Sequence, residues 1–182
     1  MTPISHVILV DEQDHPIGTM EKIEAHQNGA LHRAVSVVIF NSKGEVLIQQ
    51  RALSKYHEPG KWSNTCCTHP QPNESTLDAA IRSLKNELGM QPYITIHDQF
   101  IYKSILDNNL TENEFDHIYV GITDIPPVPN PHEVMNYRYV SISELIHDMT
   151  LYQWKYTPWS MMIANKLFQS FYLIPSSERH TI

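Results

Sequence analysis

The sequence predicts an α+β fold in which a mixed β-sheet and several helices form a single domain. The length of 182 residues suits one domain, and a domain of this size buries roughly two-thirds of the surface that its unfolded chain exposes. Short β-branched segments alternate with segments of helical periodicity, and neither an internal repeat nor a linker interrupts them. We therefore expect one domain over residues 1–182, with its core at about 30–165.

Two neighbouring segments predict a β-hairpin. Residues 33–40 are rich in β-branched and apolar side chains, which favour a buried strand. The segment NSKG at 41–44 is a turn, and residues 45–51 form the second strand. The Gly-, Pro- and polar-rich segment that follows, as far as Pro72, is expected to be a loop. Further strands are expected at 6–10, 93–97, 99–106, 113–122 and 137–140.

Residues 75–88 carry the clearest helix pattern. Ser75 and Asp78 resemble a capping box, and Gly89 stands where a helix commonly ends. Apolar residues recur at helical spacing at Leu77, Ala80, Ile81, Leu84 and Leu88. A short helix is expected after Ser141, with Glu144 completing its cap, and a last helix opens at Thr157-Pro158 and continues through Tyr172.

Composition and charge limit the classes of function. Thirteen basic residues against 20 acidic ones give a net charge of −7, which argues against a nucleic-acid binder but allows a small anionic ligand held by a few local cations. The two cysteines, Cys66 and Cys67, are adjacent, and neighbouring α-carbons lie about 3.8 Å apart, below the usual disulfide span. Reduced thiols, together with the absence of a signal-peptide or membrane-spanning pattern, predict a cytoplasmic protein without membrane contact. The sequence allows a monomer or a homodimer.

The 11 histidines differ in how much they suggest. Most of them, His57 included, have no assignable partner and are expected to be surface or hydrogen-bonded residues. His26 and His32 flank the start of the first long strand, and His69 follows the cysteine pair. Imidazoles favour transition metals, so these three are candidate ligands.

Acidic residues gather on one predicted strand face. Strand alternation places Glu112, Glu114 and then Asp116 on the same side. Two carboxylates about 7 Å apart on one face repel each other unless a cation or a proton lies between them. With the three imidazoles they could bind zinc, manganese or magnesium. An ordinary polar edge strand with scattered surface histidines explains the same spacing, because the candidate ligands come from three separate segments.

The helix at 75–88 carries part of a second pattern. Four positions fit the G-x5-E-x7-R-E-U-x-E-E-x-G-U box of Nudix hydrolases, namely Glu74, Arg82, Glu87 and Gly89. Thr68 replaces the first glycine, and Ser83 and Asn86 replace two glutamates of the box. In the full box the carboxylates gather metal ions on a diphosphate that is hydrolysed. A solvated helix face accounts for the partial match equally well.

Several separated motifs agree in order with one family. They are MEKIEAH at 20–26, LH at 31–32, RALSK at 51–55, PGKWSN at 59–64, CTHP at 67–70, ELG at 87–89, ENE at 112–114 and PW at 158–159. Across nearly the whole chain the sequence thereby resembles the type I isopentenyl-diphosphate isomerases, which have a modified Nudix fold. The resemblance implies a Nudix-like mixed β-sheet sandwiched between α-helices.

The resemblance also implies a reaction and its catalytic residues. The family interconverts isopentenyl diphosphate and dimethylallyl diphosphate for isoprenoid biosynthesis, through protonation of an alkene to a tertiary carbocation and removal of a neighbouring proton. Two proton-transfer groups must flank the hydrocarbon, and the matching positions are Cys67 and Glu114, with Cys66 left to packing. Tyr102 matches a tyrosine that assists protonation. Trp159 matches a tryptophan whose ring stabilises the cation while also forming a wall of the pocket.

The family's binding residues transfer in the same way. A first divalent ion (Mn²⁺, Zn²⁺ or Mg²⁺) would be held by His26, His32, His69, Glu112 and Glu114. Glu87 and the backbone carbonyl of Cys67 would hold Mg²⁺ against the diphosphate. The diphosphate itself would contact Lys22, Arg51 and Lys55.

One departure from the family and two alternative functions remain. Family members carry two successive arginines where this chain has Arg82-Ser83, so one phosphate-facing arginine is missing.

A Nudix-type diphosphate hydrolase is the alternative enzyme, and an inactive diphosphate-binding protein is the third class. Isomerisation is favoured because the helix has lost the hydrolytic carboxylates and because Cys67 has no task in hydrolysis.

Overall fold

A computed structural model describes residues 6–106 and 109–173 of the chain. Within these residues one nine-stranded sheet is accompanied by four α-helices. The strands are β1 (His6–Val10), β2 (Pro16–Glu21), β3 (His32–Phe40), β4 (Val46–Arg51), β5 (Trp62–Ser63), β6 (Cys66–Thr68), β7 (Ile94–Ile105), β8 (Thr111–Ile122) and β9 (Val134–Val140). The helices are α1 (Lys22–Asn28), α2 (Thr76–Leu88), α3 (Ile142–Leu151) and α4 (Pro158–Leu173), and a short 3-10 helix covers Gln153–Lys155.

Strand β3 is the centre of the sheet. It pairs in parallel with β8, which in turn pairs antiparallel with β7, and it pairs antiparallel with β6. The predicted hairpin of β3 and β4 forms at its turn, but the two strands pair only at Phe40 and Val46. Beyond that point β4 pairs with β5 and β9. The diverging strands thus leave room for β5 and β6, which lie in the segment predicted to be a loop.

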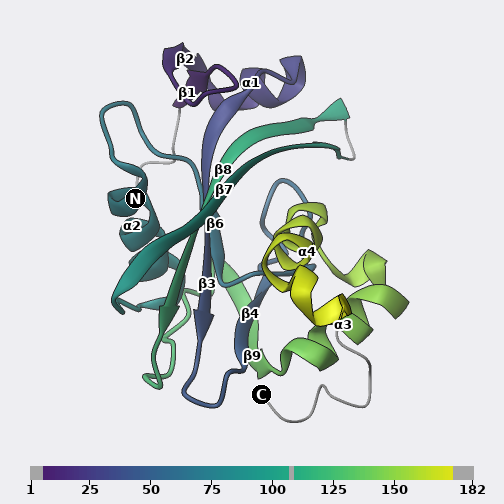
Figure 1. The fold of residues 1–182 in the computed structure, drawn as a ribbon. Coiled ribbons are helices and arrows are strands. Elements are labelled where there is room, and N and C mark those ends of the chain that lie inside the picture. Colours follow the sequence, from purple (N-terminus) through teal and green to yellow (C-terminus); the bar gives the residue numbers. More distant parts are fainter. Residues whose placement is uncertain (1–5, 107–108, 174–182) are drawn as a thin grey trace.

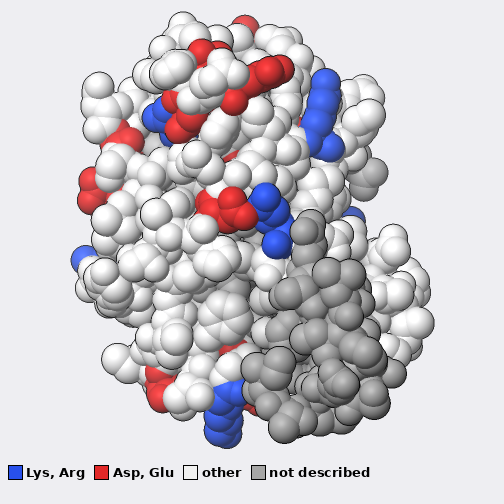
Figure 2. All heavy atoms as spheres, in the orientation of Figure 1, with Lys and Arg blue, Asp and Glu red and all other residues white. Residues whose placement is uncertain are grey.

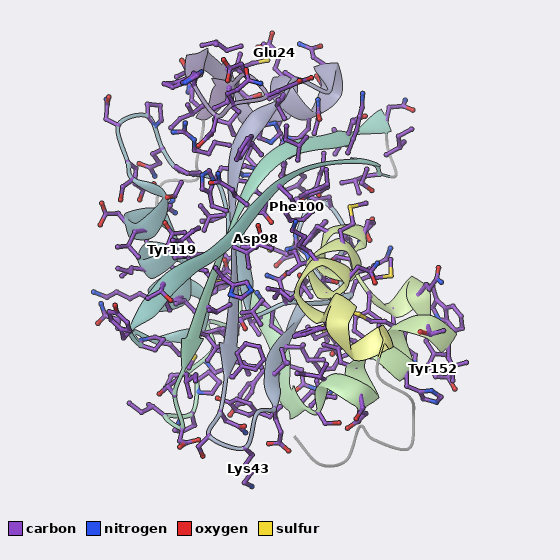
Figure 3. The ribbon with its side chains drawn as sticks, in the orientation of Figure 1. Glu24, Lys43, Asp98, Phe100, Tyr119 and Tyr152 are labelled. Carbon is purple, nitrogen blue, oxygen red and sulfur yellow. The ribbon has the colours of Figure 1, made fainter. Side chains whose placement is uncertain are left out.

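Helices cover both faces of the sheet, as predicted (Figure 1). One core cluster joins α2 to the sheet, and Tyr119 of β8 belongs to it. The other joins the sheet to α3 and α4, and Phe100 of β7 packs against it. Figure 3 shows Tyr119 on the α2 side and Phe100 on the α4 side. The α+β class with a mixed sheet between helices is therefore confirmed.

Local capping signals place the helix ends correctly. The Ser75 side chain accepts a hydrogen bond from the Asp78 backbone N–H, and Ser141 does the same for Glu144. Gly89 ends α2 with φ of 64°, and a Cβ there would lie 3.0 Å from the Val128 carbonyl oxygen. Both constraints require glycine.

Two expectations about strands need correction. The separate strands expected at 93–97 and 99–106 are one continuous strand, β7, which is interrupted by a register shift between Ile96 and Asp98. A β-bulge of this kind breaks the alternation of side chains without ending the strand. The short elements β2, α1, β5 and β6 carried too little periodicity to be predicted.

The charged side chains are dispersed over the face drawn in Figure 2, where Lys and Arg lie apart and among Asp and Glu. No helix among the described residues is long and apolar enough to cross a membrane.

Candidate active site

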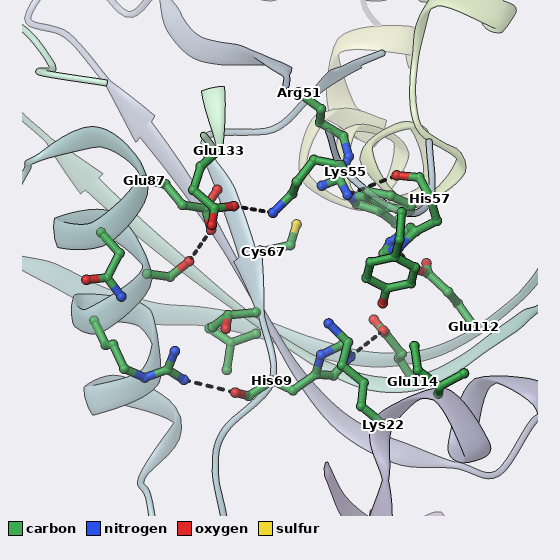
Figure 4. Close-up of a pocket in the computed structure, with 18 of the residues that line it drawn as sticks. Lys22, Arg51, Lys55, His57, Cys67, His69, Glu87, Glu112, Glu114 and Glu133 are labelled. Atoms are coloured by element: carbon green, nitrogen blue, oxygen red, sulfur yellow. Dashed lines mark hydrogen bonds and ion pairs between the residues drawn. The ribbon is translucent and has the colours of Figure 1, made fainter. Parts of the chain in front are cut away.

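One face of the sheet brings the candidate catalytic residues together. The β3–β6 register sets Cys67 opposite Ser36, and the β3–β8 register sets His32 opposite Glu114. Tyr102 of β7 lies opposite Glu114 on its other side. Paired residues point to the same face. Cys67, Glu114 and Tyr102 line a cavity of about 580 Å³, and Trp159 lines it as well. Figure 4 shows Glu112 and Glu114 on one side of the Cys67 sulfur and Glu87 and Glu133 on the other.

Four buried side chains form a cluster suited to a divalent metal ion. The ligand atoms of His26, His32, His69 and Glu114 all lie within 4.8 Å of one another. His69 Nε2 lies 2.9 Å from Glu114 Oε1 and 3.2 Å from His32 Nε2. The sequence left open whether these histidines were merely scattered over the surface. The structure excludes that reading, since all three are buried at one point.

Hydrogen bonds to backbone carbonyls orient two of these imidazoles. His26 Nδ1 donates to the Lys22 carbonyl at 2.7 Å, and His32 Nδ1 donates to the Ala30 carbonyl at 2.8 Å. The Nε2 lone pairs then face the cluster, and His26 Nε2 is buried without a hydrogen-bond partner. Such second contacts fix the tautomer of metal-binding histidines. The donor set of three imidazoles and a carboxylate therefore fits a divalent cation.

Burial favours the neutral form of two of these imidazoles. It lowers the pKa of His69 to about 3, in spite of the nearby Glu114 carboxylate, and it also lowers the pKa of His26. Burial alone would raise the pKa of Glu114, but the side chains of His32 and His69 beside it hold that pKa well below its usual range. Neutral imidazoles and an ionised carboxylate are the forms that bind metals.

Glu112 differs from Glu114 in its surroundings, although both are buried on the same strand face. Burial and then the Glu114 charge raise the pKa of Glu112 well above its usual range, so Glu112 holds a proton when Glu114 does not. The Tyr102 hydroxyl donates to Glu114 Oε2 at 2.5 Å and lies 3.1 Å from Glu112 Oε2. Glu112 is not among the four clustered ligands, and its Oε1 lies 3.6 Å from His57 Nε2.

The Cys67 thiol lines the same cavity and lies apart from this carboxylate pair (Figure 4). Its Sγ donates to Asn64 Oδ1 at 3.1 Å and lies 3.5 Å from Ser36 Oγ. Burial and then the nearby Asp116 carboxylate raise the pKa of Cys67 well above its usual range, which keeps the thiol protonated. Cys66 points to the other face and packs in the α2 core cluster, in keeping with a packing role.

Cationic side chains reach the cavity from two segments of the chain. Lys22, Arg51 and Lys55 all line it, and Lys55 forms an ion pair with Glu133. The Arg51 guanidinium lies 5.2 Å from the centre of the Trp159 ring. Local cations of this kind can hold an anionic group although the whole chain is acidic.

The Nudix-like positions on α2 are arranged differently from a cluster of carboxylates. Glu87 Oε1 accepts from Ser83 Oγ at 2.7 Å, and Oε2 accepts from Gln49 Nε2 at 2.8 Å. Arg82 is engaged elsewhere, with Glu74 at 2.7 Å and the His69 carbonyl at 3.0 Å. Ser83 thus supplies a hydrogen bond to Glu87 at the position where the resemblance implied a second arginine.

Sequence reasoning missed several residues of this cavity, among them His57 and Glu133. His57 was expected to be a surface or hydrogen-bonded residue, but its ring lies 5.5 Å from the Trp159 ring and its side chain lines the cavity. Glu133 carried no signal, because it follows a Pro-rich loop and meets Lys55 only through the fold. The position of His57 two residues after Lys55 was the one available hint.

Removing a divalent ion is expected to lower the thermal stability of the protein, because the buried cluster then loses the cation that separates its ligands. A ligand present at 100 times its dissociation constant stabilises the native state by about 2.7 kcal/mol. Calorimetry with and without EDTA, followed by titration with Mn²⁺ or Zn²⁺, measures the difference. His26→Ala should lose the response, whereas His147→Ala, on the exposed face of α3, should keep it. An equal metal response in the His26 variant would contradict the site.

Comparison with known proteins agrees with this fold and site. Residues 30–160 match the family model of the NUDIX domain. A solved structure from Deinococcus radiodurans aligns with a TM-score of 0.68 at 20% identity, covering 81% of this chain and 90% of that one. A MutT protein from Methanosarcina mazei aligns with a TM-score of 0.62 at 18% identity, covering 78% and 95%. The sheet between helices, with its site beside α2, is that of a Nudix-domain protein.

Sequence relatives narrow this class. An isopentenyl-diphosphate Delta-isomerase of Pectobacterium atrosepticum is 50% identical over 157 residues, which cover 86% of this chain and 88% of the relative. An isopentenyl-diphosphate Delta-isomerase 1 of Aromatoleum aromaticum is 46% identical over 153 residues, covering 84% and 86%. The chain belongs to the isopentenyl-diphosphate Delta-isomerase family.

Proposed function

We propose that this protein interconverts isopentenyl diphosphate and dimethylallyl diphosphate, with Cys67 and Glu114 as the two proton-transfer groups. The observation that carries the proposal is that the Cys67 thiol, the Glu114–Tyr102 pair and three cationic side chains line one cavity. A small molecule with an anionic group for the cationic side chains and a short alkene for the proton-transfer groups fits such a cavity.

The reaction adds one proton to the substrate and removes another. One group donates a proton to the terminal carbon of the double bond, which leaves a tertiary carbocation. The other group takes a proton from the carbon next to the cation on the diphosphate side, and the double bond forms one position further along. In the reverse direction the donor and the acceptor exchange roles. Both groups must lie within hydrogen-bond-like reach of the hydrocarbon.

Tyr102 and Trp159 support the two charged stages. The Tyr102 hydroxyl, hydrogen-bonded to Glu114, would carry a proton between that carboxylate and the substrate. The buried Trp159 ring offers its face to the carbocation, an interaction worth about 2 kcal/mol or more when desolvated. Exclusion of water by this wall protects the cation from capture.

The remaining family positions are proposed as binding residues. Lys22, Arg51 and Lys55 would bind the diphosphate through charge-assisted hydrogen bonds. A divalent ion (Mn²⁺, Zn²⁺ or Mg²⁺) would tune the proton affinity of Glu114, held by that residue with His26, His32 and His69 and with Glu112 beside them. A Mg²⁺ ion would offset the charge of the diphosphate, held by Glu87 and the backbone carbonyl of Cys67. Ser83 binds Glu87 and leaves the diphosphate without the family's second arginine.

Proton NMR of the protein with isopentenyl diphosphate and Mg²⁺ in heavy water tests the proposal. The expected result is the appearance of dimethylallyl diphosphate together with uptake of deuterium. Release of phosphate without a new alkene signal would instead identify a Nudix-type diphosphate hydrolase. Substrate binding without either product would identify an inactive binding protein.

The affinity for substrate is expected to fall as the pH rises through about 8. Burial, and then the neighbouring Lys55 and Arg51, lower the pKa of Lys22 to about 8. A lysine with a lowered pKa is charged below that pH and neutral above it, so the contact with the diphosphate weakens in alkali. Steady-state kinetics between pH 7 and pH 9.5 should therefore show KM rising more than kcat falls.

Lys22→Arg is the matched control for this pH dependence, because a guanidinium stays protonated throughout the range. Its KM should rise less between pH 7 and pH 9.5 than that of the wild type. The same alkaline rise in both proteins would assign the effect to another group.

A further inference from the structure

A chain of buried hydrogen bonds joins the Trp159 indole to the Cys67 thiol. Trp159 Nε1 donates to Ser63 Oγ at 3.0 Å, and Ser63 Oγ donates to Asn64 Oδ1 at 3.1 Å. The Cys67 thiol donates to the same Asn64 oxygen at 3.1 Å. Ser63, Asn64 and Trp159 are each no more than 5% exposed. Cys67 and Trp159, which are proposed to transfer a proton and to stabilise the cation, are thus connected through two residues with no proposed role of their own.

The direction of each hydrogen bond is fixed by its neighbours. Asn64 Nδ2 donates to the carbonyls of Val37 at 3.1 Å and Cys66 at 2.9 Å, so Oδ1 must face the thiol. Ser63 Oγ accepts from Trp159 and also from Thr157 Oγ1 at 3.2 Å. A hydroxyl has two lone pairs and one proton. With both lone pairs occupied, the Ser63 proton has Asn64 Oδ1 as its acceptor.

Ser63 also joins two parts of the fold. Cys67 lies on β6 within the sheet, whereas Trp159 lies on α4 in the layer of helices. A backbone hydrogen bond from the Thr157 N–H to the Trp62 carbonyl, 2.9 Å long, holds the two segments together independently of side chains. The Ser63 hydroxyl adds a side-chain contact between the same two segments, through its hydrogen bonds with Trp159 and Thr157.

We propose that Ser63 is a positioning residue that sets the Trp159 ring and, through Asn64, the Cys67 thiol at a fixed separation across the cavity. This inference rests on the proposed function, since the separation matters only if both side chains act on one substrate. The carbocation must form within reach of the thiol and at the same moment against the indole face. A misplacement of about 1 Å in such an arrangement can lower a rate by about 100-fold.

Ser63→Ala tests the inference, with Ser63→Thr as the conservative variant that keeps the hydroxyl. The alanine variant is expected to lower kcat about tenfold and to leave KM within about twofold, because the diphosphate contacts are not altered. The threonine variant should restore kcat to within about threefold of the wild type. The backbone contact between residues 62 and 157 remains in both variants and favours retention of the fold.

Two further variants separate positioning from general stability. Trp159→Phe removes the Nε1 donor and keeps an aromatic ring, so its effect and that of Ser63→Ala should combine to much less than their product. Thr65→Val is the matched control, because the buried Thr65 hydroxyl bonds to the backbone of Leu47 at 2.7 Å and of Ile39 at 2.9 Å. It should lower the melting temperature without changing kcat.

A second readout does not depend on isomerase activity. Alkylation of Cys67 by iodoacetamide, followed by peptide mass spectrometry in substrate-free protein, reports the setting of the thiol. Ser63→Ala is expected to change this rate by about threefold or more and Thr65→Val to leave it unchanged. If the wild type is inactive but Ser63→Ala still changes the alkylation rate, the proposed function is refuted and the positioning role is not. Wild-type kcat in Ser63→Ala, or independent effects of Ser63→Ala and Trp159→Phe, would overturn the positioning role.

Discussion

Replacing Glu114 with glutamine is expected to lower kcat by about 1,000-fold or more. A positioned acid–base group contributes about 100- to 10,000-fold to a rate, and here the same carboxylate also completes the buried cluster with His32 and His69. The amide keeps the volume of the side chain but can neither carry the proton nor supply a negative charge to a cation. Initial rates of dimethylallyl diphosphate formation by proton NMR measure the loss.

Glu112→Gln is the matched control for this variant. Burial and the Glu114 charge keep Glu112 protonated, and a neutral amide resembles a protonated carboxyl in shape and charge. Its kcat should therefore fall by about tenfold at most, since the amide alters no more than the one hydrogen bond to Tyr102. Equal losses in the two variants would show that the carboxylates are not differentiated, and a Glu114 variant within about tenfold of the wild type would remove Glu114 from the chemistry.

The difference between these two carboxylates illustrates what the sequence could predict. Strand alternation indicated that Glu112 and Glu114 share a face and that a cation or proton must separate them. It could not indicate which of them would be ionised. That depends on Glu114 standing opposite His32 in the parallel pairing of β3 and β8, a contact between residues 82 positions apart that no local pattern encodes.

The same distinction explains which elements were predicted. Helix α2 was correct because its cap, its apolar spacing and its terminal glycine are all local signals. Strand β6 was missed because three residues are too few to show alternation, and it pairs only because β3 and β4 diverge after Phe40. Cys67 is set in the cavity by that short strand. Its assignment from sequence therefore depended on the family resemblance and not on the pattern around it.

His57 is a residue whose position neither the sequence pattern nor the family resemblance predicted. Neither its spacing nor the family motifs singled it out, and its neighbours in the cavity come from β8 and α4. Burial, and then the positive charges of Arg51 and Lys22, lower its pKa to about 2, so it stays neutral beside Glu112. A loop residue acquires such surroundings only when distant elements pack over it.

Replacing Cys67 with alanine is expected to lower kcat by about 100- to 10,000-fold while the affinity for isopentenyl diphosphate stays within about threefold. The thiol is the proton-transfer group on its side of the cavity, and the Glu114–Tyr102 pair lies on the other. The cationic side chains that would hold the diphosphate are unchanged, so kcat should fall without a matching loss of substrate affinity. Kinetics by NMR and isothermal titration of the substrate measure the two quantities.

Cys66→Ala is the matched control because it removes an equal thiol from the next residue, on the opposite face of the same strand. Cys66 is fully buried in the α2 core cluster, so its loss should lower stability by about 1 kcal/mol and leave kcat unchanged. A catalytic defect in Cys66→Ala as large as that in Cys67→Ala would mean that the short strand β6 only needs to be packed correctly. A defect confined to Cys67→Ala requires the thiol itself, because the two variants disturb the same three residues of backbone and differ only in the side of the sheet from which the sulfur is removed.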